Sequence, residues 1–368
     1  MTTIVAAATR HLALPTGIKP FVLPSGLEAS TDLNVLLVRL TDSEGIEGHA
    51  YLWGAEQRQI PLFRATLEYL AGQVVGTPVG DPTQLRATLR RSTNFVGYDG
   101  LASFGVAAFE MAAHDLVLLR SGSSLGETIG RRRDRVRAYR TGCLLPFTVD
   151  EIVAEANDIV ESGVHAIKVQ IGKPDIAEDL DRIAAVRDSV AGHVVLMVDA
   201  VQRYELSEAL RVCDGLAELG VVRFEDALDY DDLAGYAELA ARSPIPIATG
   251  ESLYGLASFA RLLDAGIAHV VADLERVGGI AGWLAVADLV AGRGGTILPH
   301  LDPHLSAQLM STVDTPDPWL EVVPWFDALA APLRIVDGWV AVPDQAGTGF
   351  RPDPNAVDDL AVGSWQPL

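Results

Sequence analysis

The sequence predicts an α/β protein in which a parallel β-barrel follows a smaller α+β domain. From about residue 135 onward, short β-branched or apolar runs alternate with longer amphipathic stretches, as they do in a parallel sheet with crossover helices. The repeating unit is about 25 residues long, which suits one strand and one helix. The first 125 residues or so lack this repeat. Two parts with different architectures are therefore expected.

Eight strand candidates occur in the repeating part of the chain, and eight parallel strands suggest a closed barrel. The candidates are residues 136–141, 166–171, 194–199, 221–225, 245–251, 269–274, 296–300 and 320–323. Helical patterns lie between them, for example over residues 149–162, 176–189, 206–219 and 280–291. Thr148 and Glu151 predict a capping box at the start of the first of these helices, and Gly163 and Gly220 stand where helices should end.

Residues 1–125 are predicted to form the α+β domain. Alternating residues at 33–40 and 48–52 indicate two strands, joined by a hairpin through Asp42 and Gly45, and helices are expected at 62–70 and 102–120. The barrel is assigned to residues 126–334. Residues 335–368 are again typical of strand and turn, and we expect them to return to the N-terminal domain.

Composition narrows the classes of protein to which the chain can belong. Hydrophobic residues make up 49% of the chain, enough for a large core, and the formal net charge is -21. Because the basic residues form no stripe, nucleic acid is not an expected partner. We find no apolar run of the ~18–20 residues that span a bilayer and no secretory pattern at the N-terminus, so no membrane is expected either. Cys143 and Cys213 provide neither a disulfide framework nor a metal-ligand spacing, which favours a cytoplasmic protein with reduced thiols.

Polar or ionisable residues stand at the carboxyl ends of the predicted strands from the second strand onward. They are Lys168, Gln170, Asp199, Glu225, Asp226, Glu251, Asp273, His300 and Glu321. The spacing from Asp199 to Glu225 is 26 residues, and so is the spacing from Glu225 to Glu251, so one position recurs in consecutive βα units. The carboxyl ends of barrel strands converge at one mouth. Three carboxylates are therefore predicted to meet there.

A divalent cation is the simplest explanation for this cluster, because three unpaired carboxylates packed together would repel one another. Hard oxygen ligands with room for water and substrate suit Mg²⁺ better than zinc. Acidic residues at strand ends also cap helices or pair with arginines, but that alternative is weaker for three residues in register on successive strands. The sequence thus predicts Mg²⁺ ligands at Asp199, Glu225 and Glu251.

Two basic side chains are predicted to face the same mouth. His300 lies one βα unit after Asp273, so neighbouring strands can bring the imidazole and the carboxylate within hydrogen-bonding distance and make His300 a general base or acid. Lys168 lies within an apolar strand, and alternation directs it to the same side as Gln170. If that side is the barrel interior, Lys168 is buried as a neighbour of a metal ligand, as a contact of a substrate carboxylate, or in a structural ion pair.

The order and spacing of these motifs resemble those of the enolase superfamily. Within it, they are most similar to the mandelate racemase subgroup of the mandelate racemase/muconate lactonizing enzyme-like proteins. The resemblance covers nearly the whole chain, including residues 104–119 and 337–350. The segments that carry it are Ala166-Ile-Lys-Val-Gln170, Leu196-Met-Val-Asp-Ala200, Phe224-Glu-Asp226, Ala248-Thr-Gly-Glu-Ser252, Asp273-Leu-Glu-Arg-Val-Gly-Gly279, Leu298-Pro-His300 and Trp319-Leu-Glu321.

The resemblance implies a (β/α)7β TIM-like barrel under an α+β capping domain that the C-terminal segment completes. It also implies that the predicted triad holds Mg²⁺, that His300 and Asp273 form a catalytic dyad, and that Glu321 is a carboxylic acid that hydrogen-bonds the developing enolate. The implied reaction is abstraction of the proton α to the carboxylate of a small-molecule substrate. Relatives of this kind are often symmetric oligomers, so a homo-oligomer is expected.

One departure from the family pattern bears on the reaction. The usual Lys-x-Lys reads Lys168-Val169-Gln170, which places an amide that cannot titrate where a second base is expected. Racemisation needs an acid or base on each face of the α-carbon, so a one-base reaction, the dehydration of an acid sugar, is favoured. Racemisation or epimerisation of a hydroxy acid or an amino-acid derivative stays open, with Lys168 as a further catalytic candidate that reaches the substrate. A metal-binding barrel without catalytic activity is the third alternative.

Substrate specificity in such folds depends on capping-domain loops that close over the mouth. Residues 17–30, 51–57 and 94–99 are candidates by their position. Tyr51 and Trp53, together with Gln170 on the barrel, are predicted to contact the substrate, although aromatic residues there would equally suit packing between the two domains.

Overall fold

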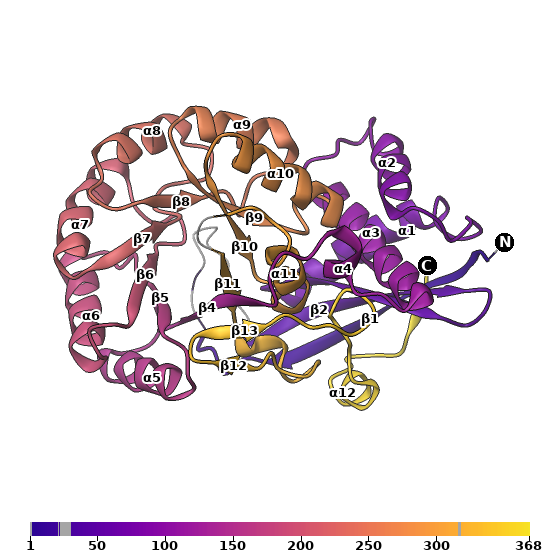
Figure 1. The fold of residues 1–368 in the computed structure, drawn as a ribbon, viewed down its shortest axis with the longest axis horizontal. Coiled ribbons are helices and arrows are strands. Elements are labelled where there is room, and N and C mark those ends of the chain that lie inside the picture. The colour runs from indigo at the N-terminus through magenta and orange to yellow at the C-terminus, as the bar shows by residue number, and fades with distance from the viewer. Residues whose placement is uncertain (1, 21, 23–30, 316–317) are drawn as a thin grey trace.

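The fold is shown by a computed structural model that describes residues 2–20, 22, 31–315 and 318–368 (Figure 1). A ring of strands and helices forms one part of the molecule, and the N-terminal domain lies against it together with both chain termini (Figure 1). In the predicted loop 17–30, residue 21 and residues 23–30 lie outside the described part of the chain.

Eight parallel strands form the barrel. In chain order they are β4 (Arg135–Gly142), β5 (Ala166–Gln170), β6 (Val195–Asp199), β7 (Val221–Glu225), β8 (Ile247–Thr249), β9 (His269–Asp273), β10 (Thr296–His300) and β11 (Trp319–Val322). Successive strands pair from β4 to β10, and β11 returns to pair in parallel with β4 while it contacts β10. The observed strand ends lie within two residues of the predicted ones. The predicted barrel is therefore confirmed.

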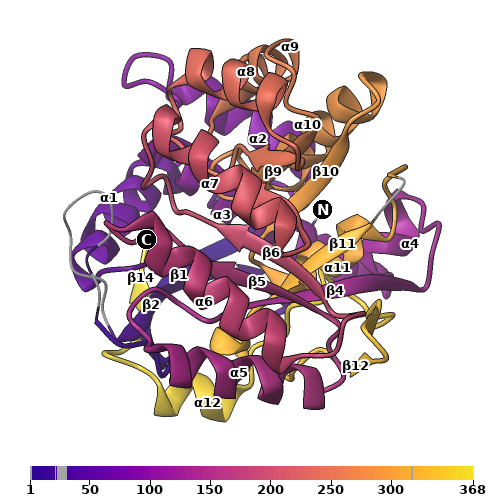
Figure 2. The same cartoon turned by 90° about the vertical axis from the view of Figure 1, so that its left-hand side faces the viewer.

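Helices cover the outside of the barrel, as the view in Figure 2 shows for α5 to α7. They are α5 (Val149–Glu161), α6 (Ile176–Ser189), α7 (Leu206–Glu218), α8 (Leu233–Arg242), α9 (Gly255–Asp264), α10 (Ile280–Gly292) and α11 (Pro303–Met310). The predicted capping box begins α5: the Thr148 amide donates to Glu151 Oε2 at 2.8 Å, and the Glu151 amide donates to Thr148 Oγ1 at 3.3 Å. Gly163 and Gly220 follow α5 and α7 with φ values of 89° and 73°, which fits their predicted place at helix ends.

In its described residues, the capping domain combines an antiparallel sheet with helices. The strands are β1 (Ile4–Pro15), β2 (Asp32–Asp42) and β3 (Glu47–Gly54), and the helices are α1 (Ile60–Ala71), α2 (Pro82–Ser92) and α3 (Leu101–Ser121), followed by the short α4 (Leu125–Ile129). The predicted hairpin joins β2 to β3, where Asp42 Oδ1 accepts from the amides of Glu44 and Ile46, both at 2.9 Å. Alternation did not reveal β1, which pairs with β2 over its whole length.

Helix α3 is the central helix of the capping domain. Gly48 allows β3 to approach it closely, because a Cβ at that position would lie 2.4 Å from the carbonyl oxygen of Ala112. Among the described residues, α3 is the one helix long and apolar enough to cross a bilayer, although 78% of its apolar stretch is buried inside the protein.

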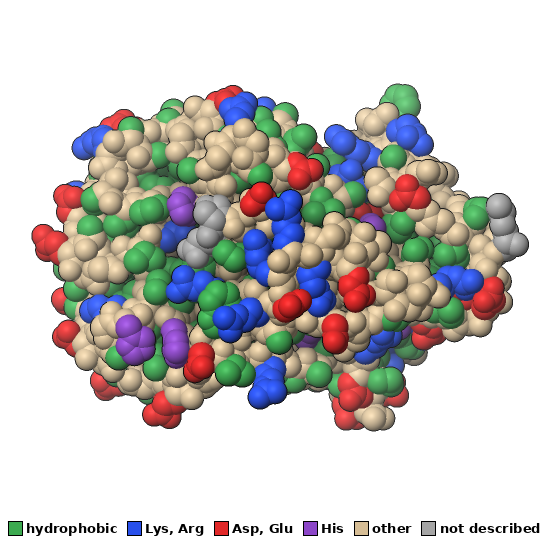
Figure 3. All heavy atoms as spheres, in the orientation of Figure 1, with side chains coloured by type: hydrophobic (Ala, Val, Ile, Leu, Met, Phe, Trp, Pro, Cys, Tyr) green, Lys and Arg blue, Asp and Glu red, His purple; other side chains and the backbone are tan. Residues whose placement is uncertain are grey.

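On the face shown in Figure 3, basic side chains lie among acidic ones.

The C-terminal segment contacts both parts of the fold. Strands β12 (Ile335–Val336) and β13 (Trp339–Ala341) form a hairpin whose second strand pairs with β4 at residues 135–137 of the barrel. That edge of β4 is available because β5 begins to pair only at Arg140. The chain then reaches the capping domain through α12 (Pro354–Asp359) and β14 (Gln366–Pro367), which pairs with β1. The prediction that residues 335–368 return to the capping domain therefore does not hold for the β12–β13 hairpin, which pairs with the barrel, but it holds for β14.

Candidate active site

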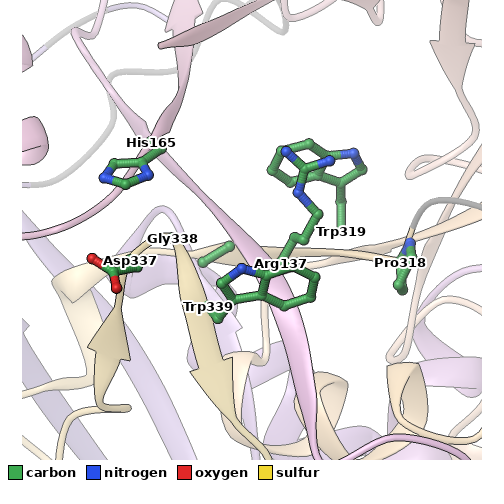
Figure 4. Close-up of a pocket in the computed structure, with 8 residues that line it drawn as sticks. Arg137, His165, Pro318, Trp319, Asp337, Gly338 and Trp339 are labelled. Carbon is green, nitrogen blue, oxygen red and sulfur yellow. The ribbon is translucent and has the colours of Figure 1, made fainter. Parts of the chain in front are cut away.

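A cavity of about 560 Å³ lies at the carboxyl ends of the barrel strands, where the capping domain covers them. A second cavity, of about 390 Å³, lies at the opposite end of the barrel and is lined by Arg137, His165, Trp319 and Asp337 among others (Figure 4). Of the described residues that line this second cavity, only Asp337 is acidic. The cavity at the carboxyl ends is therefore the candidate active site.

Alternation along the strands builds the site in layers, because side chains two residues apart point into the barrel together. The lower layer is one buried cluster of Tyr139, Ala166, Met197, Ala248, Val271, Leu298 and Trp319. Two residues further along, the strands carry Thr141, Lys168, Asp199, Asp273, His300 and Glu321. Lys168 and Gln170 both line the cavity, so β5 directs both toward the barrel interior.

The three predicted metal ligands lie together. Asp199, Glu225 and Glu251 each offer one carboxylate oxygen, and these oxygens lie within 4.8 Å of one another. Burial raises the pKa of Asp199 to about 7, with the charge of Glu225 adding to the effect, and burial also raises the pKa of Glu251. Glu225 Oε2 is buried and accepts no hydrogen bond from the described residues. A divalent cation would add charge to the three carboxylates and supply the contact that Glu225 Oε2 lacks, so the residues fit Mg²⁺.

Lys168 provides the positive charge of this cluster. Its Nζ lies 2.5 Å from Glu225 Oε1, 3.1 Å from Glu321 Oε1 and 3.4 Å from Asp199 Oδ2, and the side chain is almost fully buried. Burial alone would lower the pKa of Lys168, but the carboxylates of Glu225 and Glu321 outweigh burial and raise it well above its ordinary value. Lys168 is therefore a charged neighbour of two predicted metal ligands.

His300 and Asp273 form the predicted pair. Nδ1 of His300 lies 2.7 Å from Asp273 Oδ2, and Nε2 lies 3.3 Å from Glu251 Oε2. Burial alone would lower the pKa of His300, but Glu251 and Asp273 outweigh burial and raise it to about 10. Arg276 Nη1 lies 3.1 Å from Asp273 Oδ2 and helps to hold the pKa of Asp273 below its ordinary value against the effect of burial. Asp273 is thus an ionised partner that orients the imidazole.

Glu321, which the resemblance implies is a carboxylic acid, has hydrogen-bond donors at both of its side-chain oxygens. The Thr141 hydroxyl donates to Glu321 Oε1, and the amide of Leu301 donates to Oε2 at 2.9 Å. Burial would raise the pKa of Glu321, but the charges of Lys168 and His300 outweigh burial and lower it to about 2. The Lys168 ammonium group lies 3.1 Å from Glu321 Oε1, and the role of Glu321 as a carboxylic acid stays a prediction.

The three predicted substrate-binding residues occupy different places. Gln170 and Trp53 line the cavity, and the Trp53 ring centroid lies 6.0 Å from that of His300. Tyr51 does not line it: its ring packs against Phe326 and Phe350 at centroid distances of 4.9 and 4.7 Å, inside the interface between the domains. Tyr51 and Trp53 share one side of β3. Only Trp53, which is nearer the end of the strand, reaches the cavity.

Glu275 and Arg276 are among the cavity residues that did not emerge as candidates from the sequence. Glu275 and Arg276 follow the end of β9 and line the cavity, and Glu275 Oε1 accepts from the backbone amide of Trp53 at 3.0 Å. This hydrogen bond connects the barrel to the capping domain. Both residues lie in the segment from Asp273 to Gly279, so their charged side chains directly after a strand end were the available signal.

Comparisons with known proteins agree with this geometry. Residues 151–356 match the family described as enolase C-terminal domain-like. The chain is 29% identical over 332 residues to the L-talarate/galactarate dehydratase of Salmonella typhimurium, a match that covers 89% of this chain and 83% of that protein. It is 30% identical over 353 residues to the D-galactarolactone cycloisomerase of Agrobacterium fabrum, with 89% and 91% covered.

A solved structure extends the similarity to the whole fold. The L-talarate dehydratase of a Polaromonas species, complexed with Mg and L-glucarate, matches with a TM-score of 0.88 at 28% identity, covering 100% of this chain and 99% of that chain. The barrel, the capping domain and the acidic cluster at the mouth define an α/β-barrel protein with a metal site. Together with the family match, they show that the chain belongs to the enolase superfamily.

Proposed function

We propose that this protein is a Mg²⁺-dependent lyase that removes the proton α to the carboxylate of an acid sugar and eliminates water. The proposal rests on the contacts of the buried His300 imidazole with two carboxylates. Nε2 lies beside Glu251 of the metal triad, and Nδ1 is held by Asp273. The similarity to an acid sugar dehydratase over 89% of the chain supports the reaction class.

Each residue of the site has a distinct role in this proposal. Asp199, Glu225 and Glu251 would hold Mg²⁺, which when bound neutralises the substrate carboxylate and stabilises the negative charge that develops next to it. His300 Nε2 takes the proton from the α-carbon in the neutral form of the imidazole; a cation held by Glu251 would offset the charge that contributes most to raising the pKa of His300. Asp273 accepts from Nδ1 and so selects the tautomer in which Nε2 is the base.

The elimination converts a 2,3-dihydroxy acid into a 2-keto acid. The C2 proton passes to His300, the C3–O bond breaks, and the leaving hydroxyl accepts a proton from His300 and departs as water. The resulting enol becomes the ketone when C3 gains a proton from solvent. Gln170 cannot take up a proton on the opposite face, and Lys168 is held by carboxylates within 2.5 to 3.4 Å. These contacts favour the one-base dehydration over a two-base racemisation.

The test is an NMR experiment in D₂O with Mg²⁺ and a panel of acid sugars. We expect loss of the C2 proton signal together with formation of a 2-keto acid, and neither should occur with His300→Asn. Deuterium in both C2 epimers without a keto acid would establish a racemase or epimerase instead. A protein that binds Mg²⁺ but exchanges no proton from any acid tested would be the inactive barrel.

We further propose that the enzyme acts in the cytoplasm, in the breakdown of carbohydrate acids, as a homo-oligomer. Cys143 and Cys213 are both buried free thiols, which supports a reducing compartment. Light scattering coupled to size-exclusion chromatography measures the oligomeric state, and a mass of 39.2 kDa would contradict an oligomer.

A further inference from the structure

The turn that follows His300 has an unusual backbone. Leu301 and Asp302 both adopt left-handed conformations, with φ values of 52° and 46°, although neither is a glycine. Two consecutive L-residues in this conformation are costly and persist only where the surrounding structure enforces them. On the barrel side, the Leu301 amide donates to Glu321 Oε2, and the Leu301 carbonyl accepts from the hydroxyl of Ser306 at 2.8 Å. The turn therefore determines how His300 is held at the end of β10.

Asp302 stands at the N-cap of α11 but does not cap the helix. An aspartate at this position ordinarily accepts from an amide of the first helical turn, whereas the carboxyl of Asp302 makes no such bond. The residue is buried, with 3% of its surface exposed. Burial raises the pKa of Asp302 to about 7, and the charges of Asp273 and His300 act on it as well, so the carboxyl lies close to the dyad.

The capping domain provides a contact for this carboxyl. The hydroxyl of Tyr51 on β3 lies within hydrogen-bonding range of the Asp302 carboxyl, and both residues line the same small cavity between β3 and α11. Oδ2 of Asp302 is buried and has no hydrogen-bond partner elsewhere among the described residues. Burial and the charge of Asp302 raise the pKa of Tyr51 well above its ordinary value, so the hydroxyl keeps its proton and can donate. Because Phe326 and Phe350 pack against the Tyr51 ring, the hydroxyl has a fixed position.

We propose that Asp302 is a positioning residue for His300, and that Tyr51 is the group of the capping domain that holds Asp302 in place. The inference rests on the proposed function, in which His300 Nε2 is the base. Asp302 is two residues from His300 in a turn with a constrained backbone, so a change in its contact with Tyr51 is carried to the imidazole. The capping domain thus orients the catalytic base as well as covering the cavity. A contact that only stabilised the domain interface would affect stability and leave the rate unchanged.

The test replaces single tyrosine hydroxyls. Tyr51→Phe keeps the ring, and Tyr204→Phe is the matched control, because the Tyr204 hydroxyl donates to the buried carboxylate of Asp179 at 2.6 Å and neither residue lines the active-site cavity. We expect both variants to lower Tm by similar amounts, because each loses one buried contact between a tyrosine and a carboxyl group. Only Tyr51→Phe should lower kcat, by roughly 10- to 100-fold, with KM and the Mg²⁺-dependent rise in Tm unchanged. Equal kcat values in the two variants would overturn the inference.

Variants of Asp302 test the same contact from the barrel side. Asp302→Asn keeps an oxygen that can accept from the Tyr51 hydroxyl, and asparagine adopts the left-handed conformation more readily than most residues. Asp302→Ala loses both properties. We expect Asp302→Ala to lower kcat as Tyr51→Phe does, Asp302→Asn to retain most of the native kcat, and Tyr51→Phe to cause no further loss in the Asp302→Ala background. Equal losses in the two Asp302 variants, or additive losses in the double variant, would contradict the proposed contact.

A spectroscopic measurement separates this inference from the proposed function. In protein labelled with ¹⁵N-histidine, the Nδ1 proton that His300 shares with Asp273 gives an NMR signal that is identified by its loss in His300→Asn. We expect this signal to shift in Tyr51→Phe and to stay in place in Tyr204→Phe. If the native protein converts no acid, the proposed function fails and this signal decides the inference alone: a signal that does not move in Tyr51→Phe overturns it.

Discussion

Replacing Lys168 with methionine tests how the acidic cluster is balanced. The Lys168 ammonium group lies within 3.4 Å of three buried carboxylates, and methionine keeps a similar volume without the charge. Removing one partner of a buried ion pair costs about 3–5 kcal/mol, because the remaining charge is left without compensation. Lys168→Met should therefore destabilise the metal-free protein by about this amount.

The expected change in melting temperature follows from the length of the chain. An unfolding entropy of ~2.1 cal/mol/K per residue gives roughly 0.8 kcal/mol/K for 368 residues. A loss of about 3–5 kcal/mol then lowers Tm by about 4–6 °C. Mg²⁺ at about 100 times its Kd stabilises the folded protein by about 2.7 kcal/mol, or ~3–4 °C. The variant should gain more from Mg²⁺ than the native protein, because no ammonium group competes for the carboxylates.

Thermal unfolding in EDTA and in a series of Mg²⁺ concentrations measures both effects. Lys173→Met is the matched control, because Lys173 Nζ lies 3.3 Å from Glu178, an exposed carboxylate at the surface, and surface ion pairs contribute little to stability. We expect the control to behave like the native protein. The reasoning is refuted if Lys168→Met melts at the native temperature in EDTA, or if Mg²⁺ raises its Tm by no more than it raises the native Tm.

Three further predictions concern other residues. His300→Asn should lower kcat by a factor of about 10²–10⁴ while the Mg²⁺-dependent rise in Tm persists; a variant that also loses this rise would contradict the separate roles of dyad and triad. Burial and two nearby arginines lower the pKa of His49 from 6.5 to about 4. Between these pH values the unfolded chain binds more protons than the folded protein. The contribution of His49 to stability is therefore complete above pH 6.5 and is lost as the pH falls toward 4. Urea unfolding of His49→Gln should therefore depend less on pH in this window, and an unchanged slope would count against the assignment. Gly48→Ala brings a Cβ within 2.4 Å of the Ala112 carbonyl oxygen and should lower the free energy of unfolding by about 1–3 kcal/mol, which an unaltered urea midpoint would disprove.

The barrel half of the site could be predicted because its geometry is local and repeated. One position per βα unit determines which residue reaches the mouth, and alternation determines which side chains point inward. This is why the spacing of Asp199, Glu225 and Glu251 was sufficient to bring their oxygens within 4.8 Å of one another. The His300–Asp273 hydrogen bond follows from the same repetition, since the two residues are paired in register on β10 and β9.

The capping-domain half depends on contacts between distant segments, which periodicity does not encode. The separation of Tyr51 from Trp53 is an example: both lie on one side of β3, but the packing of Phe326 and Phe350 decides that Tyr51 belongs to the core. The hydrogen bond from Trp53 to Glu275 joins residues 222 positions apart. Such pairings require the relative position of the two domains to be known.

The ionisation of the site also depends on depth, which alternation alone does not specify. Lys168 and Gln170 share the interior side of β5, but two residues along a strand correspond to ~6.6 Å, so Lys168 lies one layer below Gln170. At that depth Lys168 reaches Glu225 and Glu321 and keeps Glu321 ionised. Gln170 lies at the mouth, where its Oε1 accepts from the amide of Leu145 at 3.3 Å. In the structure Lys168 contacts buried carboxylates, whereas Gln170 occupies the position at the mouth where the family pattern has its second lysine.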